Sequence, residues 1–442
     1  MSSADAATAD GAIAVEPSPL SAAVRWKIFA YVGALLVLQG FGSPANGVVV
    51  VPISFMLKNK FHLTAHGLAL FGLAAGAPVY VSFLFGLARD TWNPLGMRDR
   101  GFFVLFGSIT AAVYAAFAFA PVTLETLLVA SVALGASFLF VSAALNGLIA
   151  TIGQQHVMSG QVSTLWNIVG GAPPLAALVL GARLSGMLER GGAERSAHLL
   201  FMVGAAIMAG VALYGFWRPA AVFDNIQVER RAGGHLGDDV KRLVRHWPIY
   251  PALLIFALSN FAPGSGTALL YYLQNTLHAS DAQWGDWNGI YQISFLPTLA
   301  LYGVLCRRLS LRTLLFWGTL VTIPQMTPLL LSHSMRVALW AAIPMGLTGG
   351  MSTAAYLDLL IRACPAGLQG ALLMLAASLA AIVAQLADVL GADLYDRFGG
   401  FGVCVVAITI AYALILPVLW LVPRRPTDTA DGQRPAEPFT AE

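Results

Sequence analysis

Charged residues are scarce in this sequence. Asp, Glu, Lys and Arg make up 11% of its 442 residues, whereas soluble domains carry about 25%. Hydrophobic residues account for 57%, and the mean hydropathy is +0.72. This composition excludes an ordinary soluble domain and indicates an all-α membrane protein that crosses the bilayer many times.

Cysteine is also nearly absent, and enzyme motifs are missing. Cys306, Cys364 and Cys404 lie far apart in or beside apolar runs, so they match neither a metal-binding spacing nor a disulfide framework. His62 and His66 have no neighbouring carboxylate to complete a zinc site. No glycine-rich phosphate loop with a lysine occurs, which excludes pumping driven by nucleotide hydrolysis in this chain alone. We expect no enzyme activity, no metal, no cofactor and no nucleic-acid partner.

Twelve apolar segments are long enough to cross a hydrocarbon layer of about 30 Å. Their predicted bounds are 28–57, 66–88, 101–120, 123–150, 160–184, 198–217, 248–275, 285–306, 311–331, 336–361, 367–395 and 401–422. The longest polar stretch, 218–247, predicts a cytoplasmic linker between two six-helix bundles, 25–217 and 248–422. The polar ends, 1–24 and 423–442, are predicted to be disordered cytoplasmic tails.

Lysine and arginine are distributed unevenly between alternate loops. With the N-terminus inside, 18 of the 25 basic residues fall on the cytoplasmic side, as the positive-inside rule requires. We therefore expect a multi-pass protein of the inner (cytoplasmic) membrane with both termini in the cytoplasm. Within the linker, residues 238–247 predict either a short amphipathic helix on an anionic membrane surface or a plain solvated segment.

The two halves of the chain repeat each other. A shift of 210 residues places Gly160 on Gly370 and the run V-L-G-A-R-L, from Val179 to Leu184, on V-L-G-A-D-L, from Val389 to Leu394. Parallel six-helix repeats of this kind hold their site between the halves, near the middle of the membrane.

The densest group of charges separates the second and third spans, within residues 86–101. It consists of Arg89, Asp90, Arg98, Asp99 and Arg100. Opposite charges at neighbouring helix ends can pair and latch one face of a membrane protein until it opens. We therefore take Asp90, Arg98 and Arg100 as candidate gating residues. An ordinary solvated loop that obeys the positive-inside rule is the alternative.

Helix-breaking residues interrupt two spans at matching positions. The first span contains Gly42-Ser43-Pro44, and the seventh contains Pro263 and Gly264. Proline removes a backbone donor and glycine loosens the turn, so both helices should bend. Paired interruptions in matching helices point to a binding site and a hinge, although glycine and proline are also common in membrane helices.

Polar side chains inside the spans give the candidate substrate site. Amides and aromatic rings gather on the helices that would line a central cavity, and each polar group there needs a partner. The candidate substrate-binding residues are Gln39, Asn46, Trp166, Asn167, Asn260, Tyr271, Tyr291, Gln292 and Tyr356. These groups donate and accept hydrogen bonds without neutralising charge, which favours a neutral or zwitterionic, partly aromatic solute.

Only two acidic residues lie within the predicted spans rather than at their ends, Asp358 and Asp388. Buried carboxylates are costly, so both are candidates for coupling transport to an ion such as the proton. Snorkelling or pairing is equally consistent with the sequence, and Arg362 lies one helical turn after Asp358.

Three stretches resemble known transporters. Gly86, Asp90, Gly96, Arg98 and Arg100 are similar to the loop signature Gly-x-x-x-Asp…Gly-x-Arg-x-Arg of the major facilitator superfamily. The inserted Asn93-Pro94-Leu95, the run from Gly160 to Gly171 and the run from Ala363 to Leu372 resemble the folate–biopterin transporter family within it. The resemblance implies a secondary active or facilitative transporter of a small organic solute that works by alternating access, and we expect a monomer in the lipid bilayer.

This chain also departs from the folate–biopterin pattern. That family usually has acidic residues in the fourth span, where this chain has Ser142 and Asn146. A folate anion would need a basic partner, and no basic residue lies inside the predicted spans away from their ends. The fold and transport class therefore follow from the resemblance, with a pterin-like solute rather than folate itself. A factor for pigment or light-harvesting complex assembly and a muropeptide-type permease are the alternatives.

Overall fold

The computed structural model describes residues 20–50, 53, 56–57, 60–63, 65–188, 193–224, 236–398 and 400–433, and every regular element in them is a helix. The helices of the N-terminal half are α1 (Ala22–Gly42), α3 (Ala65–Ala75), α4 (Ala77–Tyr80), α5 (Phe83–Thr91), η1 (Pro94–Gly96), α6 (Asp99–Ala118), α7 (Leu124–Gln155), α8 (Ser159–Leu188) and α9 (Ala193–Phe216). Two helices connect the halves: α10 (Ala220–Phe223) and α11 (Leu236–Arg245).

The C-terminal half continues in the same manner. Its helices are α12 (Ile249–Asn260), α13 (Thr267–Tyr271), η3 (Tyr272–Thr276), α14 (Asp281–Ile293), α15 (Leu296–Leu305), α16 (Leu311–Thr322), α17 (Thr327–Leu330), α18 (Met335–Ala363), α19 (Gln369–Arg397), α20 (Phe401–Ala413), α21 (Ile415–Leu419) and α22 (Arg424–Thr427). The expected all-α membrane fold is confirmed.

Each half buries its own apolar core. Tyr31, Phe102 and Tyr114 belong to the core of the N-terminal half, and Trp287 and Tyr302 belong to that of the C-terminal half. All five aromatic residues are essentially inaccessible to solvent. Burial of this kind stabilises the packing within each half.

Seven helices in the described part of the chain are long and apolar enough to cross a membrane. They are Ala22–Gly42, Asp99–Ala118, Leu124–Gln155, His198–Phe216, Leu311–Leu330, Gln369–Arg397 and Phe401–Leu421. Other predicted spans are interrupted: the segment 66–88 falls on α3, α4 and α5, and the segment 285–306 falls on α14 and α15. Proline stands in the first turn of α4 and of α15, where a new helix begins without needing its N–H.

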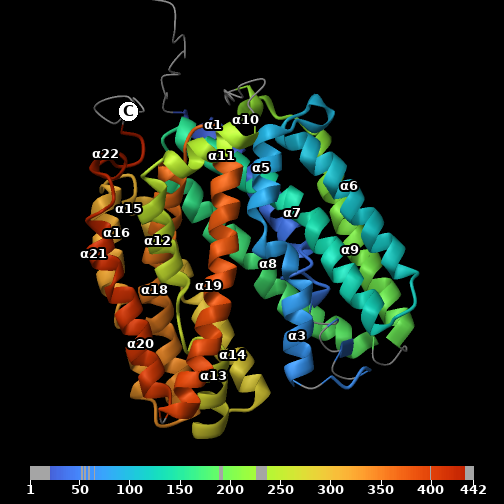
Figure 1. The fold of residues 1–442 in the computed structure, drawn as a ribbon, viewed down its shortest axis with the longest axis vertical. Helices are drawn as coiled ribbons and strands as arrows, with labels where there is room; N and C mark the ends of the chain where they lie inside the picture. The colour runs from blue at the N-terminus through green and yellow to red at the C-terminus, as the bar shows by residue number, and fades with distance from the viewer. Residues whose placement is uncertain are drawn as a thin grey trace, which may run out of the picture.

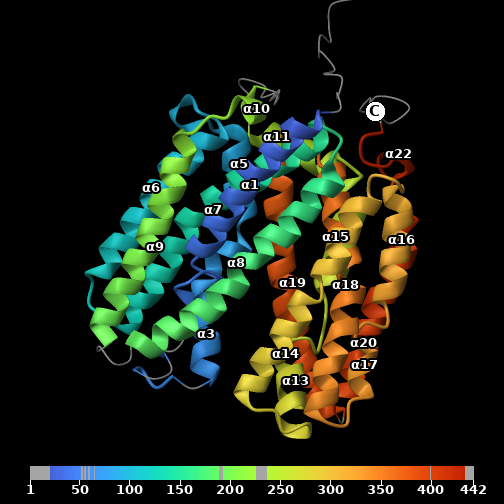
Figure 2. The same cartoon turned by 180° about the vertical axis from the view of Figure 1, so that it is seen from behind.

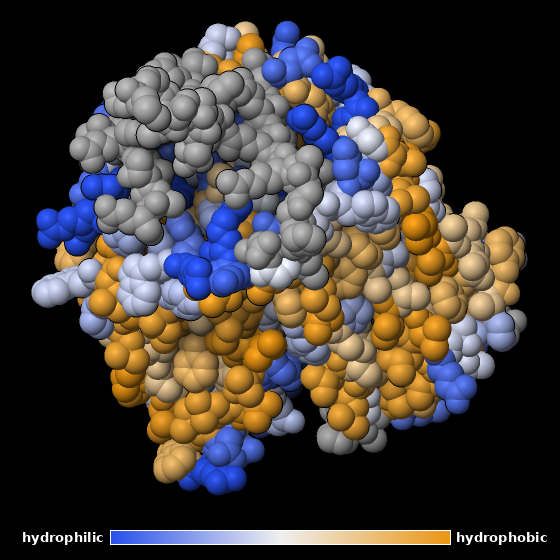
Figure 3. All heavy atoms as spheres, turned by 45° about the horizontal axis from the view of Figure 1, so that its top comes forward, coloured by the Kyte–Doolittle hydropathy of each residue, from blue (hydrophilic) through white to orange (hydrophobic). Residues whose placement is uncertain are grey.

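The two halves meet at one end and diverge at the other (Figures 1 and 2). The start of α1, the connecting helices α10 and α11, and α22 lie together at one end, called the closed end below. At the opposite, open end the region of α3 is separated from α13 and α14. Hydrophobic residues cover the sides of the molecule, hydrophilic ones gather at the closed end, and a cleft separates the halves below it (Figure 3).

The interruptions expected in the first and seventh spans are present. Helix α1 ends at Gly42, and the Ser43 hydroxyl accepts hydrogen bonds from the N–H groups of Ala45 and Asn46 at 3.3 and 3.2 Å. In the seventh span, α12 ends at Asn260 and α13 begins at Thr267. The backbone between them is not helical, so the seventh span contains two separate helices.

The prediction for the C-terminal tail needs one correction. Residues 424–433 are ordered and packed, with Asp431 only 6% exposed, so the expected disordered tail does not begin at residue 423. The polar side chains of this segment bind groups on helices that are distant in the sequence, and the composition of the segment alone does not predict such contacts. Residues 1–19, the linker residues 225–235 and residues 434–442 lie outside the described part. The short helix expected at 238–247 is α11, which spans residues 236–245.

Candidate functional site

A buried ion cluster occupies the closed end of the N-terminal half. Arg89, in the last turn of α5, contacts Asp99 at the start of α6 through Nε and Nη2 at 2.6 and 2.8 Å. Its Nη1 donates to Oδ1 of Asp90 at 2.8 Å. All three side chains are nearly inaccessible. Two carboxylates share one guanidinium, so the cluster needs further donors to satisfy its excess negative charge.

Those donors come from the other half. Asp90 accepts hydrogen bonds from the backbone N–H groups of Gly370 at 3.1 Å and Ala371 at 2.7 Å, in the first turn of α19. The first N–H groups of a helix lack partners inside it and carry the positive end of its dipole. Asp90 therefore joins the two halves by capping a helix that belongs to the opposite bundle.

The two loop arginines chosen from the sequence lie outside this cluster. Arg98 is exposed, and its backbone N–H donates to the Asn93 side chain at 2.7 Å. The Arg100 guanidinium lies 5.5 Å from the ring centre of Phe223. The partner of Asp90 within its own half is instead Arg89, the adjacent residue, which belongs to the same charged group but was not among the candidate gating residues.

Close backbone packing accompanies the Asp90 bridge. A Cβ atom added to Gly86 of α5 would overlap the carbonyl of Gly370 and the Cα of Ala371. One turn earlier, the Ser82 hydroxyl donates to the Met374 carbonyl at 2.9 Å and contacts the Ser378 hydroxyl at 2.8 Å. Only a residue without a side chain at position 86 permits this approach of α5 and α19.

A third element, the end of α7, also bridges the halves. The Gln154 amide donates to the carbonyls of Ile361 and Cys364, each at 2.7 Å, and its oxygen accepts from Gln369 at 2.9 Å. The carbonyls at the end of α18 lack partners inside that helix. Gln154 satisfies two of them, a role that sequence reasoning missed because a single glutamine at a helix end carries no motif.

The candidate substrate residues of the N-terminal half are only partly gathered. Trp166 Nε1 on α8 donates to the Asn146 side chain on α7 at 3.2 Å, and Asn146 reaches the Met374 sulfur of α19 at 3.6 Å. This group therefore combines an indole, an amide and a thioether across the two halves. Asn167 bonds the Ser163 carbonyl of its own helix.

The remaining N-terminal candidates differ in exposure. Gln39 is 9% exposed in α1, whereas Asn46 is exposed in the interruption that follows. Their places in the first span agree with the sequence, but no single cluster contains both of them and Trp166.

In the C-terminal half, Tyr291 is the candidate with the clearest polar environment. Gln325 donates to its hydroxyl at 3.0 Å, and Trp287 stacks on its ring with a centroid separation of 5.2 Å. Gln325, which follows α16, did not stand out in the sequence. Gln292 and Tyr271 are exposed, and Asn260 bonds the Phe256 carbonyl of its own helix at 2.8 Å.

Tyr356 is a buried member of the candidate set. It is 4% exposed, belongs to the core of the C-terminal half, and forms a 2.9 Å hydrogen bond with the Thr319 hydroxyl of α16. Its position along α18 suggested a cavity residue, but the sequence does not show which face of the helix it occupies. Tyr356 is therefore a packing residue in this conformation.

Both intramembrane acids have partners. Asp358 is fully buried near the closed end, where Arg362 Nε donates to it at 2.9 Å and the Tyr302 hydroxyl donates at 2.7 Å. Asp388 of α19 accepts from the backbone N–H and the hydroxyl of Thr267 at 2.7 and 2.8 Å. Asp388 thus caps α13 at the point where the seventh span resumes.

The interruption of the seventh span is built on glycine. Gly264 has a φ of +106°, a region that L-residues rarely adopt. A Cβ there would overlap that of Cys404, and a Cβ at Gly391 would overlap the backbone of Pro263 and Gly264. The interruption is therefore held in place by close contact with α19 and α20.

Comparison with known proteins places the sequence beside one transporter. No protein-family model matches the chain. The folate–biopterin transporter of Synechocystis sp. is 24% identical over 428 residues, which cover 91% of this chain and 83% of that protein.

The fold is similar to that of several solved transporter structures. The crystal structure of the major facilitator superfamily transporter FucP in the outward conformation has a TM-score of 0.68 at 15% identity, over 90% of this chain and 98% of that one. For the proton:xylose symporter XylE, bound to a glucose derivative, the TM-score is 0.67 at 12% identity, over 91% and 98%. A bacterial homologue of the iron transporter ferroportin in an outward-facing state has a TM-score of 0.64 at 18% identity, over 89% and 98%. The chain has the fold of the major facilitator superfamily, and the resemblance inferred from its loop is confirmed.

Proposed function

We propose that this protein carries a small organic solute across the inner membrane by alternating access, with its closed end toward the cytoplasm. The observation that supports this most directly is the asymmetry of the two ends: polar contacts join the halves at the closed end, while the halves diverge at the open end. In alternating access, two bundles rock about a central site. The bridge from Asp90 to α19 would then form and break once in each cycle.

The solute that fits best is neutral or zwitterionic, partly aromatic and pterin-like. A charge at the centre of the bilayer costs about 2.5–3.5 kcal/mol on insertion scales unless it is neutralised. Asp358 is paired with Arg362 and Asp388 caps α13, so neither acid is held ready for a cationic solute. The groups around Trp166 and Tyr291 offer hydrogen bonds and flat apolar faces instead.

If transport is coupled to protons, Asp388 is the better candidate of the two acids. It is half-buried beside the interruption of the seventh span, whereas Asp358 is fully buried in a cluster at the closed end. A carboxylate that changes its charge next to a hinge can alter the helix cap there and so bias the conformation.

A ligand screen tests the proposed substrate. The purified protein is heated with pterins, folates, nucleosides, amino acids or muropeptides, because a ligand that binds only the folded state raises its melting temperature. We expect stabilisation by neutral pterins, followed by uptake of the stabilising compound into proteoliposomes with weak dependence on membrane potential. Uptake of a dianionic folate with a strong dependence on potential would contradict the proposed cavity chemistry.

Replacing Asp90 with asparagine is expected to reduce uptake strongly while leaving folded yield nearly unchanged. Arg89 keeps its two contacts to Asp99, so no buried charge loses its partner. The amide cannot accept from both Gly370 and Ala371 as the carboxylate does, and a hydrogen bond to a charged group contributes about 1.5–3 kcal/mol. Uptake and yield of Asp224→Asn, which removes an exposed carboxylate, are the control. Normal uptake by Asp90→Asn would rule out the latch.

Replacing Gly264 with alanine is expected to disturb the interruption of the seventh span. The new methyl group would face the Cys404 side chain in a backbone region unfavourable to L-residues. Spin-label distances between the halves at the open end should then shift or broaden. Gly285→Ala, on α14 with free space around the added atom, is the matched control. An unchanged distance distribution in Gly264→Ala would show that this residue is no part of the hinge.

A further inference from the structure

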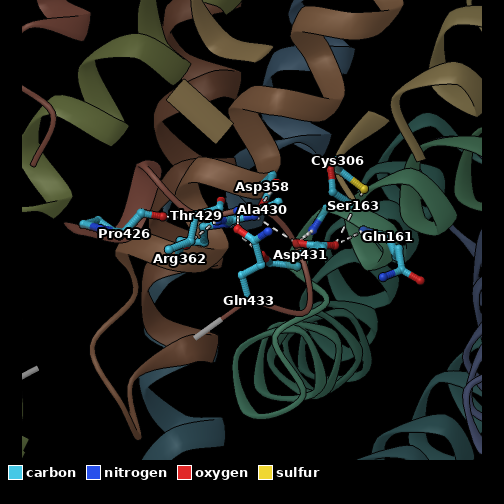
Figure 4. A network of polar contacts seen from close by, with 12 residues as sticks. Gln161, Ser163, Cys306, Asp358, Arg362, Pro426, Thr429, Ala430, Asp431 and Gln433 are labelled. Carbon is cyan, nitrogen blue, oxygen red and sulfur yellow. Dashed lines mark hydrogen bonds and ion pairs between the residues drawn. The ribbon is translucent and has the colours of Figure 1, made fainter. Parts of the chain in front are cut away.

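The C-terminal segment crosses the boundary between the halves at the closed end. Backbone N–H groups of Asp431 and Gly432 donate to the carbonyl of Cys306 in the C-terminal half and to that of Val157 in the N-terminal half, at 2.8 and 2.7 Å. A short turn of the chain, closed by a hydrogen bond from the Gln433 N–H to the Ala430 carbonyl, is thereby fixed to both bundles at once. Figure 4 shows Asp431 lying between Arg362 and Gln161 of α8.

The Asp431 carboxylate has a complete set of donors. It accepts from the backbone N–H groups of Gly160 at 3.3 Å and Gln161 at 3.0 Å, in the first turn of α8. Arg362 Nη2 on α18 donates to it at 2.9 Å, and the Cys306 sulfur lies 3.7 Å away. Helix N–H groups and a guanidinium from opposite bundles thus bind a single carboxylate.

Arg362 is held in place for this contact. Its guanidinium also donates to Asp358 at 2.9 Å, to the Ser159 hydroxyl at 2.9 Å and to the Thr429 carbonyl at 2.8 Å. Burial and the neighbouring Asp358 carboxylate raise the pKa of Asp431 to about 6. The Arg362 guanidinium counters this shift through its ion pair with the Asp431 carboxylate at 2.9 Å.

This arrangement repeats the Asp90 bridge in the other direction. Under the shift of 210 residues, Gly160 and Gln161 correspond to Gly370 and Ala371, the two donors to Asp90. Asp90 reaches from the N-terminal half to the start of α19, and Asp431 reaches from the C-terminal end of the chain to the start of α8. The starts of α8 and α19 are thus both capped by a carboxylate that lies outside the helix's own half.

The source of the carboxylate differs between the halves. The sequence Gly86-Leu-Ala-Arg-Asp90 lies near the end of α5, and the sequence that we match to it, Gly303-Val-Leu-Cys-Arg307, begins 217 positions later in the last turn of α15 and runs just past its end. The position equivalent to Asp90 is thus Arg307, which is exposed. The second half has no acid at that place, and the C-terminal segment supplies one.

We propose that the first turn of α8, together with Arg362, is a carboxylate-binding site that the chain fills with its own Asp431, and that this contact is a second latch at the closed end. The proposal rests on alternating access as the function. When the closed end opens, α8 and α18 separate, so Asp431 must leave at least one of its two sets of donors. The C-terminal segment therefore helps to set the balance between the two conformations.

Alkylation of Cys306 tests whether the segment is a latch. Cys306 is 1% exposed beside Asp431, so release of the segment and opening of the boundary should expose its thiol to N-ethylmaleimide. In Asp431→Ala we expect the alkylation rate of Cys306, followed by peptide mass spectrometry, to rise about tenfold, in line with the loss of a charged hydrogen bond. Cys404, buried in the core of the C-terminal half, is the internal control.

Asp428→Ala is the matched variant, because Asp428 lies in the same segment with an exposed side chain. Its Cys306 should stay as protected as in the wild type. Equal protection of Cys306 in Asp431→Ala and the wild type would overturn the latch. This measurement needs no substrate, so it separates failure of the latch from failure of the proposed transport.

Discussion

Replacing Arg89 with methionine is expected to remove most of the folded protein. The substitution leaves Asp90 and Asp99 buried without the guanidinium that contacts both at 2.6–2.8 Å. Breaking a buried ion cluster by removing one partner costs about 3–5 kcal/mol, a large part of the total stability of a typical domain. The yield of monodisperse protein in detergent and its melting temperature measure the effect.

The double variant Asp90→Asn and Asp99→Asn in the Arg89→Met background separates charge from packing. If the loss comes from the two unpaired carboxylates, neutralising them should restore much of the yield. Arg98→Met is the matched control, since Arg98 belongs to the same loop and is exposed. An unchanged melting temperature in Arg89→Met alone would mean that water reaches both carboxylates.

Replacing Gly86 with alanine is expected to hold the closed end open. The added methyl group would overlap the Gly370 carbonyl and the Ala371 Cα across the boundary, and backbone cannot rotate away as a flexible side chain can. Overpacking of this kind costs about 1–3 kcal/mol, which changes a conformational ratio by about 5- to 150-fold. Uptake should fall accordingly, and N-ethylmaleimide should reach Cys306 at the closed end faster.

Folded yield should survive this change, because each half keeps its own core. Gly210→Ala serves as the matched control, since a Cβ at that position on α9 meets no atom within 4 Å. Wild-type uptake together with protected Cys306 in Gly86→Ala would show that α5 and α19 can separate slightly without consequence for the cycle.

The features that sequence predicted best depend on local chemistry. Hydrophobic length and the positive-inside rule indicated the all-α membrane class, and Pro44, Pro263 and Gly264 marked the two interrupted spans, because proline and glycine disrupt any helix that contains them. The 210-residue repeat paired Gly160 with Gly370. In the structure both glycines stand in the first turn of boundary helices, each capped by a carboxylate.

The features that sequence missed depend on contacts between distant residues. Asp431 lies in a polar segment that resembles a disordered tail, and its donors are about 70 and 270 positions away along the chain. Tyr356 lies in the core of the C-terminal half, and the hydropathy of an almost wholly apolar helix such as α18 does not show which of its residues pack into that core. The pairing of Trp166 with Asn146 likewise required knowledge of how α7 and α8 pack.

Burial of the boundary ion pairs affects how the protein responds to dissolved salt. Mobile ions screen charges that face water, such as Arg218 and Asp224, whose side chains are 61% and 54% exposed. Mobile ions cannot approach Arg89 and Asp90, whose side chains are only 4% and 1% exposed. The contacts of Arg89 at the closed end should therefore keep nearly the same strength over a wide range of salt concentrations, whereas the exposed ion pair of Arg218 and Asp224 should weaken as salt is added.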